Sequence, residues 1–121
     1  MPIVDVEVVA AGGRLVSQPS VEVLASALGH VFGSPAGRTW VRFRMLPASS
    51  YAENDTLVPV ESLPVFVTVL LATPPHGAEL QAQVLAVTQA VAAWLAVSQD
   101  RVHVGYAPPG VGRQAFGGKL V

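Results

Sequence analysis

A strand–helix–strand pattern that occurs twice is the feature that most constrains this sequence. Residues 2–10 (PIVDVEVVA) and 64–72 (PVFVTVLLA) are strand-length runs that align at an offset of 62 residues. Residues 40–43 (WVRF) align with residues 101–104 (RVHV) at an offset of 61. A repeat of this kind indicates two copies of one supersecondary unit.

Each pair of predicted strands is joined by a segment with helical periodicity. In the first unit, Ser17, Gln18 and Pro19 open the helix and Gly33 ends it. The apolar positions at helical spacing are Val21, Leu24, Leu28 and Phe32 in the first unit, and Leu80, Val84, Val87, Val91, Trp94 and Leu95 in the second.

The repeat predicts the fold class. A helical crossover makes the two strands of a unit parallel, so two β–α–β units form an α/β fold, with a four-stranded sheet and both helices on one face. We expect a single domain over residues 1–121, with halves at about 1–60 and 61–121. The polar segment 47–63 is predicted to be a connection with a short strand near residues 57–60. A short hairpin is predicted around Phe116, Gly117 and Gly118.

Composition adds expectations about partners. Hydrophobic residues make up 51% of the chain and charged residues 12%, yet apolar runs such as residues 65–72 are too short to span a membrane. We therefore expect the uncovered sheet face and the apolar surplus to be buried in an oligomer. A net charge of −1 without basic runs argues against nucleic acid or an anionic membrane as partner. The absence of cysteine excludes disulfides, and no signal peptide is evident, so a cytoplasmic location is expected.

Three motifs resemble the tautomerase superfamily. Pro2 follows Met1 and opens a strand of a duplicated β–α–β unit. Residues 98–106 (SQDRVHVGY) resemble the last long strand of the macrophage migration inhibitory factor branch, and residues 116–120 (FGGKL) resemble the terminal hairpin of 4-oxalocrotonate tautomerase. The resemblance implies a homotrimer with sites where subunits meet.

Pro2 is the catalytic base that the resemblance implies. After removal of Met1 its nitrogen is a secondary amine, and α-amino groups titrate near ~8 in model peptides. Burial or a neighbouring guanidinium lowers such a pKa, which leaves a neutral amine that serves as base or nucleophile. If Met1 is retained, the nitrogen is a blocked amide. The alternative is that Pro2 simply begins a strand.

Three arginines are candidate ligands for a substrate carboxylate. Arg42 and Arg44 share one face of their predicted strand, and the guanidinium fork suits carboxylates. The resemblance places Arg42 at a substrate-binding position and Arg14 in the loop after the first strand. The alternative for Arg42 and Arg44 is a salt-bridged face with Asp5 or Glu7.

Two further candidates are His103 and Phe116. In the inhibitory-factor branch a Tyr stands at the position of His103, an Asn at that of Gly105 and a Lys near that of Ser34, so the pocket of that branch is altered here. Phe116 is expected to line the site or to pack at an interface. Tyr51 with Glu53, Asn54 and Asp55 is either a source of an acid or a polar turn. Neither His30 nor His76 has a partner at metal-ligand spacing, so no metal site is expected.

The predicted function is enol–keto tautomerisation of small 2-oxo acids or unsaturated carboxylates, without a cofactor. Pro2 transfers the proton, Arg42, Arg14 and Arg44 bind the carboxylate, and His103 and Phe116 shape the pocket. Alternatives are a decarboxylase or hydratase with the same groups, or a trimeric binding protein without turnover. The loop at residues 72–76 lacks the paired arginines of the dehalogenase branch, which disfavours dehalogenation.

Overall fold

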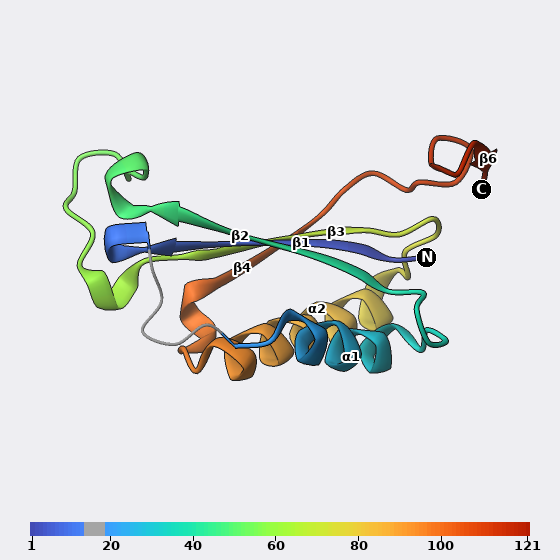
Figure 1. Cartoon of the computed structure of the whole chain (residues 1–121), viewed down its shortest axis with the longest axis horizontal. Helices are drawn as coiled ribbons and strands as arrows, with labels where there is room; N and C mark the ends of the chain where they lie inside the picture. The colour runs from blue at the N-terminus through green and yellow to red at the C-terminus, as the bar shows by residue number, and fades with distance from the viewer. Residues whose placement is uncertain (14–18) are drawn as a thin grey trace.

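Four strands and two helices in the order predicted from the repeat make up the body of the protein (Figure 1). The computed structural model describes residues 1–13 and 19–121. The elements are β1 (Ile3–Ala10), α1 (Val21–Phe32), β2 (Trp40–Pro47), β3 (Val65–Leu70), α2 (Gly77–Leu95), β4 (Val102–Tyr106), β5 (Ala115–Phe116) and β6 (Lys119–Leu120), with short 3₁₀ turns at Ala11–Gly13, Ala48–Ser50, Val60–Ser62 and Gln99–Arg101.

The sheet has the strand order β2-β1-β3-β4. Strands β1 and β2 are parallel, β3 and β4 are parallel, and the central pair β1–β3 is antiparallel. Both helices lie against the same face of the sheet (Figure 1), which confirms the predicted fold class. Strands β2 and β4 are the two edges.

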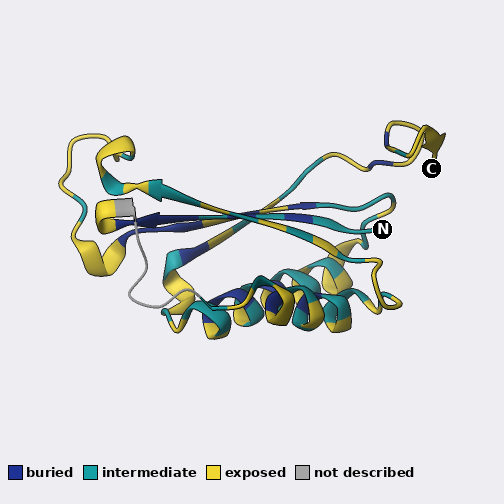
Figure 2. Cartoon of the chain, viewed as in Figure 1, coloured by how far each residue is buried: buried dark blue, intermediate teal, exposed yellow. Residues whose placement is uncertain are grey.

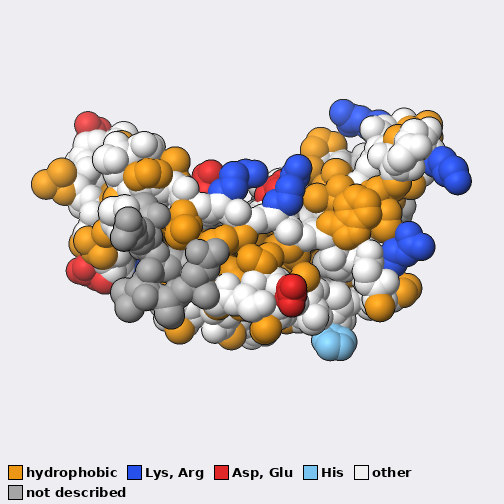
Figure 3. Space-filling view, in the orientation of Figure 1, with side chains coloured by type: hydrophobic (Ala, Val, Ile, Leu, Met, Phe, Trp, Pro, Cys, Tyr) orange, Lys and Arg blue, Asp and Glu red, His pale blue; other side chains and the backbone are white. Residues whose placement is uncertain are grey.

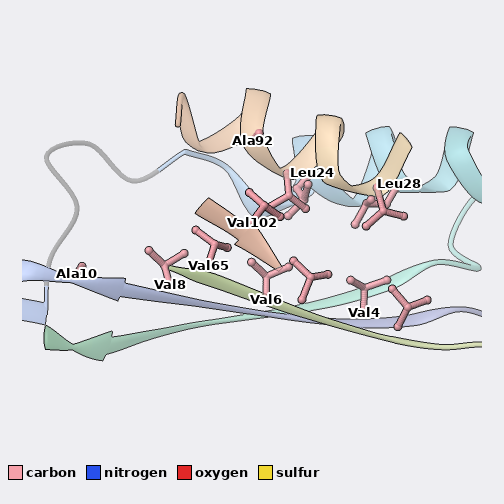
Figure 4. Packing of buried hydrophobic residues seen from close by; sticks show 13 residues of the cluster. Val4, Val6, Val8, Ala10, Leu24, Leu28, Val65, Ala92 and Val102 are labelled. Carbon is pink, nitrogen blue, oxygen red and sulfur yellow. The ribbon is translucent and has the colours of Figure 1, made fainter. Parts of the chain in front are cut away.

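The core lies between the sheet and the helices. Alternate residues of β1 and β3 form one buried cluster with Leu24 and Leu28 of α1 and with Val87 and Val91 of α2. Figure 4 shows Val4, Val6 and Val8 of β1 pointing toward the helices. Burying one such side chain stabilises the fold by about 1.5–3 kcal/mol. The fully buried strand residues are Val4, Val6, Val9, Val65, Val67 and Val69. Figure 2 shows that burial is concentrated in the central strands and on the inner sides of the helices.

The opposite side, which we call the open face, has neither helix against it (Figure 1). Its residues alternate with those of the core, as period-2 side-chain geometry requires. It carries Ile3, Asp5 and Glu7 of β1, Trp40, Arg42 and Arg44 of β2, Phe66 and Thr68 of β3, and His103 and Gly105 of β4.

The helix ends agree with the sequence in part. Gly33 caps α1 in the left-handed conformation, as predicted. Ser20 precedes α1, whereas Ser17 and Gln18 lie outside the described residues. Helix α2 ends at Leu95, and the residue that caps it, Ala96, adopts φ 54°, an unusual conformation for a residue with a side chain. No helix in the described part of the chain is long and apolar enough to cross a membrane.

Two sequence predictions need correction. Residues 57–60 do not form a strand, because the chain turns there into the 3₁₀ segment Val60–Ser62. The repeat offset of 62 for the first strand of each unit is also wrong. It places Val4, which is fully buried in the core, over Phe66 on the open face. An offset of 61 takes Val4 to Val65 and Val41 to Val102, and so keeps every core position in the core.

The predicted C-terminal hairpin is present as β5 and β6. The chain leaves β4 and crosses the end of β3, where the Gly110 N–H donates to the Leu71 carbonyl at 2.8 Å. The hairpin therefore lies at the end of the sheet at which the N-terminus lies (Figure 1).

Candidate functional site

Pro2 lies at the start of the central strand β1 and is half-buried. Its carbonyl accepts a hydrogen bond from the Trp40 N–H at 3.0 Å, which continues the parallel pairing of β1 with β2 by one step. Met1 is also half-buried, with its sulfur 3.3 Å from Nη1 of Arg38. The N-terminal end is thus held against the segment between α1 and β2.

Trp40 connects Pro2 to the C-terminal hairpin. Its indole Nε1 donates to the Gly37 carbonyl at 3.0 Å, and its ring meets Phe116 edge to face, with centroids 5.3 Å apart. Trp40 remains 45% exposed on the open face. From the sequence, Trp40 is predicted only as the first residue of a strand. No sequence signal marks it, because Trp40 meets Pro2 and Phe116 only in the folded chain.

The middle of the open face carries a row of ion pairs. Nε and Nη2 of Arg42 lie 2.6 and 2.9 Å from the two carboxylate oxygens of Asp5. Arg44 lies more loosely between Asp5 and Glu7, at 3.9 and 3.8 Å. In Figure 3, basic and acidic side chains lie side by side at the bottom of the concave upper surface. We call Asp5, Glu7, Arg42 and Arg44 the charged quartet.

Arg42, a predicted ligand for a substrate carboxylate, is already paired with a carboxylate of its own chain. The hydrogen bond from Arg42 to Asp5 and the charge of Asp5 raise the pKa of the guanidinium, so Arg42 is cationic throughout the working pH range. Its side chain is 66% exposed, but two of its donors already bind a carboxylate. Any carboxylate ligand at Arg42 would therefore have to compete with Asp5 for this fork.

The far end of the open face holds an aromatic row. Phe66 lies between Tyr51 and His103, with ring centroids 5.9 Å away on each side. The Tyr51 hydroxyl donates to Oε2 of Glu53 at 2.7 Å, and this bond raises the pKa of the Tyr51 phenol. Tyr51 and Glu53 also line a hollow of about 250 Å³ that is formed by the segment between β2 and β3.

One chain does not bring all the predicted site residues together. In the sheet register Ile3, next to Pro2, pairs with Leu70, whereas Phe66 pairs with both Glu7 and His103. Pro2 and His103 are therefore at opposite ends of the sheet. Phe116 lies at the Pro2 end through Trp40, and Arg42 and Arg44 lie between the two ends. Arg14 lies outside the described residues.

A larger hollow, of about 460 Å³, lies on the other side of the molecule beside α1 and includes none of the predicted site residues. It contains the hydroxyl of Thr39, which is buried without a hydrogen-bond partner. Within residues 1–13 and 19–121, no cluster of three or more His, Asp or Glu side chains is arranged to hold a metal ion.

Comparison with solved structures decides the fold family. The chain superimposes on the F6 fused 4-OT asymmetric trimer with a TM-score of 0.76, over 98% of this chain and 94% of that chain, at 19% sequence identity. The chain has the tautomerase fold. Pt0534 inactivated by 2-oxo-3-pentynoate is similar at a TM-score of 0.74 and 15% identity, covering 98% and 94% of the two chains.

The tautomerase fold also includes macrophage migration inhibitory factor proteins. The homologue from Prochlorococcus marinus is similar at a TM-score of 0.71 and 14% identity, over 98% of this chain and 97% of that chain. The sequence matches no protein-family model and no curated protein. At these sequence identities the shared feature is the backbone fold.

Proposed function

We propose that the protein is a homotrimeric, cofactor-independent tautomerase of small 2-oxo acids or unsaturated carboxylates, with Pro2 as its base. The position of Pro2 carries the proposal. It stands at the N-terminal end of a central strand of the tautomerase fold, with its carbonyl held by Trp40 and an aromatic pair beside it.

Two observations support assembly as a trimer. Within the described residues, no helix packs on the open face and β2 and β4 each lack a strand neighbour on their outer side, and fused 4-OT proteins of this fold form trimers. Pro2 and His103 lie at opposite ends of one sheet, so a site that uses both takes them from two chains. In an assembly, residues of a neighbouring chain would cover the exposed part of the Trp40 side chain.

The chemistry needs one proton carrier and one anion ligand. The neutral Pro2 nitrogen removes the proton from the enol oxygen, and the resulting ammonium returns a proton to the carbon, so the reaction is a net isomerisation. Arg42 releases the Asp5 carboxylate and binds the carboxylate of the substrate in its place. Arg44 lies beside Arg42, and Arg14 is a further candidate ligand. His103 and Phe116, together with Trp40, shape the pocket.

The proposed base is tested with an electrophile. Pt0534, which has the same fold, was inactivated by 2-oxo-3-pentynoate. A neutral amine adds to such a conjugated alkyne, forming a nitrogen–carbon bond while the proton moves to the neighbouring carbon. Mass spectrometry of protein lacking Met1 should find one adduct per chain, on the peptide that begins with Pro2. The matched control is protein that retains Met1, which should remain unmodified.

Turnover is measured on the same two samples, with phenylpyruvate and 2-hydroxymuconate as enol substrates. The clipped protein should ketonise at least one of them, and the Met1-retaining protein should not. Equal rates in the two samples would remove Pro2 from the mechanism. Modification of Pro2 without turnover of either enol would favour the decarboxylase or hydratase alternative. An unreactive and inactive clipped trimer would favour a binding protein.

A further inference from the structure

The segment that leads from α1 into β2 brings Arg38 to the N-terminal end of the chain. The Arg38 N–H donates to the Pro35 carbonyl at 3.1 Å, and the Gly37 carbonyl accepts the indole N–H of Trp40 at 3.0 Å. Trp40 in turn donates its backbone N–H to the Pro2 carbonyl. The backbone around Arg38 is therefore held beside the residues that lead into β1.

The side chain of Arg38 extends to Met1. Its Nη1 lies 3.3 Å from the Met1 sulfur, and a thioether is only a weak hydrogen-bond acceptor. Within residues 1–13 and 19–121 this sulfur is the only hydrogen-bond partner of the guanidinium, and no carboxylate forms an ion pair with it. Residues 14–18 contain no acidic residue. Arg38 is thus an exposed cation that no carboxylate of the described residues neutralises.

Arg38 differs in this respect from the two arginines of β2. Arg42 donates two hydrogen bonds to Asp5, and Arg44 lies 3.9 Å from Asp5 and 3.8 Å from Glu7. An anion that binds to Arg42 has to displace a carboxylate, whereas an anion that binds to Arg38 replaces only a thioether. Because a guanidinium binds a carboxylate through charge-assisted hydrogen bonds, the second exchange is the more favourable one.

Removal of Met1 changes Arg38 and Pro2 together. The Met1 side chain joins its sulfur to the nitrogen of Pro2, so the place that the sulfur occupies lies within roughly 7 Å of that nitrogen. The cleavage that turns the nitrogen into a basic amine also takes away the partner of the guanidinium. The amine and the guanidinium then border the same vacated space, which has the length of a small 2-oxo acid.

We propose that Arg38 binds the substrate carboxylate once Met1 is removed, and so places the reacting carbon next to the Pro2 nitrogen. The inference rests on the proposed function, in which Pro2 is the base, and it adds a carboxylate ligand that needs no exchange with Asp5. The exposed ring of Trp40 provides an apolar surface beside it. The positive charge of Arg38 also lowers the pKa of the Pro2 amine, because it disfavours the ammonium form.

Two electrophiles that differ only in the carboxylate test this role in protein lacking Met1. The first, 2-oxo-3-pentynoate, has a carboxylate beside its keto group, and the second, 3-pentyn-2-one, has a methyl group in its place. Both react with a neutral amine in the same way: a nitrogen–carbon bond forms, one π bond of the alkyne breaks, and the amine proton moves to the neighbouring carbon. The ratio of the two rates at Pro2 therefore measures recognition of the carboxylate, and it cancels any change in the basicity of the amine.

The variant Arg38→Gln should lower the ratio of the carboxylate probe to the uncharged probe by about tenfold or more, as expected for a lost charge-assisted hydrogen bond. Arg38→Lys keeps the charge but not the planar fork, so it should restore part of the ratio. In Arg38→Gln the pH at which 3-pentyn-2-one reacts at half its maximal rate should also rise, because a positive charge near the amine is gone. Mass spectrometry of the N-terminal peptide gives each rate.

The outcomes separate this inference from the proposed function. An unchanged ratio in Arg38→Gln would overturn the role of Arg38, and this includes equal losses with both electrophiles, which a merely structural role would produce. Failure of both electrophiles to modify Pro2 in clipped protein that retains Arg38 would instead contradict the proposed function itself.

Discussion

Arg42 holds Asp5 with two nitrogens, at 2.6 and 2.9 Å, on the face where a substrate carboxylate is proposed to bind. Both groups are solvent-accessible, so the pair adds little to the stability of the fold. Its more important effect is on the site. Asp5 occupies the same fork that a substrate would use, and it keeps the guanidinium oriented across the open face.

The first prediction concerns this competition. Asp5→Asn removes the internal carboxylate and should lower KM for a carboxylate substrate several-fold. Arg42→Ala removes the fork and should lower kcat/KM by about tenfold or more, as expected for a lost charge-assisted hydrogen bond. Steady-state kinetics measure both effects, with the exposed Asp100→Asn as the matched control. Unchanged kinetics in both variants would place Arg42 outside the site.

The second prediction concerns Tyr51. Its hydroxyl donates to Glu53, which favours the protonated phenol and raises its pKa above the usual value of about 10. The stabilising bond is therefore fully present at neutral pH and is lost as the pH rises through the folded-state pKa. Ultraviolet titration of Glu53→Gln should show the Tyr51 pKa moved down. Burial separately raises the pKa of the other phenol, Tyr106, which should not respond to this change.

At the scale of elements, the strands and helices follow from residue patterns, but their precise ends do not. The alternation in β1 and β2 and the helical spacing in α1 and α2 predict the elements that form. The apolar residues at 57–60 look like a strand in isolation, yet Leu57 is 95% exposed and the chain makes a 3₁₀ turn. Similarly, the alignment of the two halves that matches Pro2 to Pro64 pairs identical residues. Only the burial of the side chains shows that this alignment places core residues of β1 over open-face residues of β3.

The third prediction concerns the end of α2. Ala96 caps this helix with φ 54°, where a Cβ is disfavoured. Ala96→Gly should stabilise the protein by about 0.5–1 kcal/mol, which corresponds to a rise in Tm of about 3 °C. Ala93→Gly, at an exposed position inside the same helix, should destabilise by a similar amount. Thermal melts compare them, and a lower Tm for Ala96→Gly would contradict this view of the cap.

At the scale of the whole molecule, a single chain holds the parts of the proposed site at separate places on the open face. The duplication predicts the sheet, the helices and the uncovered face, and the sequence also points to Pro2. It does not reveal that Trp40 connects Pro2 to Phe116, because that contact joins residues far apart in the chain. Nor does it reveal that His103 is at the other end of the sheet, since this depends on the register between β1 and β3.

The fourth prediction follows from the proposed assembly. If folding and trimer formation are linked, mass action makes Tm rise with protein concentration. Calorimetry over a hundredfold range of concentration should show a steady increase. The Leu57→Ser variant, which changes an exposed side chain on the segment between β2 and β3, provides a control for solubility effects. A Tm that is independent of concentration would argue against a trimer coupled to folding.

The 61-residue offset between the halves also shows which residue of the second half corresponds to Pro2. It makes Leu63 the counterpart of Pro2, at the start of the other central strand. The nitrogen of Leu63 belongs to an internal peptide bond, so it is never basic, whatever happens to Met1. That end is also closed: Leu63 is buried, and its carbonyl accepts a hydrogen bond from Nε of Arg101 at 2.7 Å. Of these two corresponding strand starts only Pro2 can therefore carry an α-amine, so under the proposed function each chain supplies a single base.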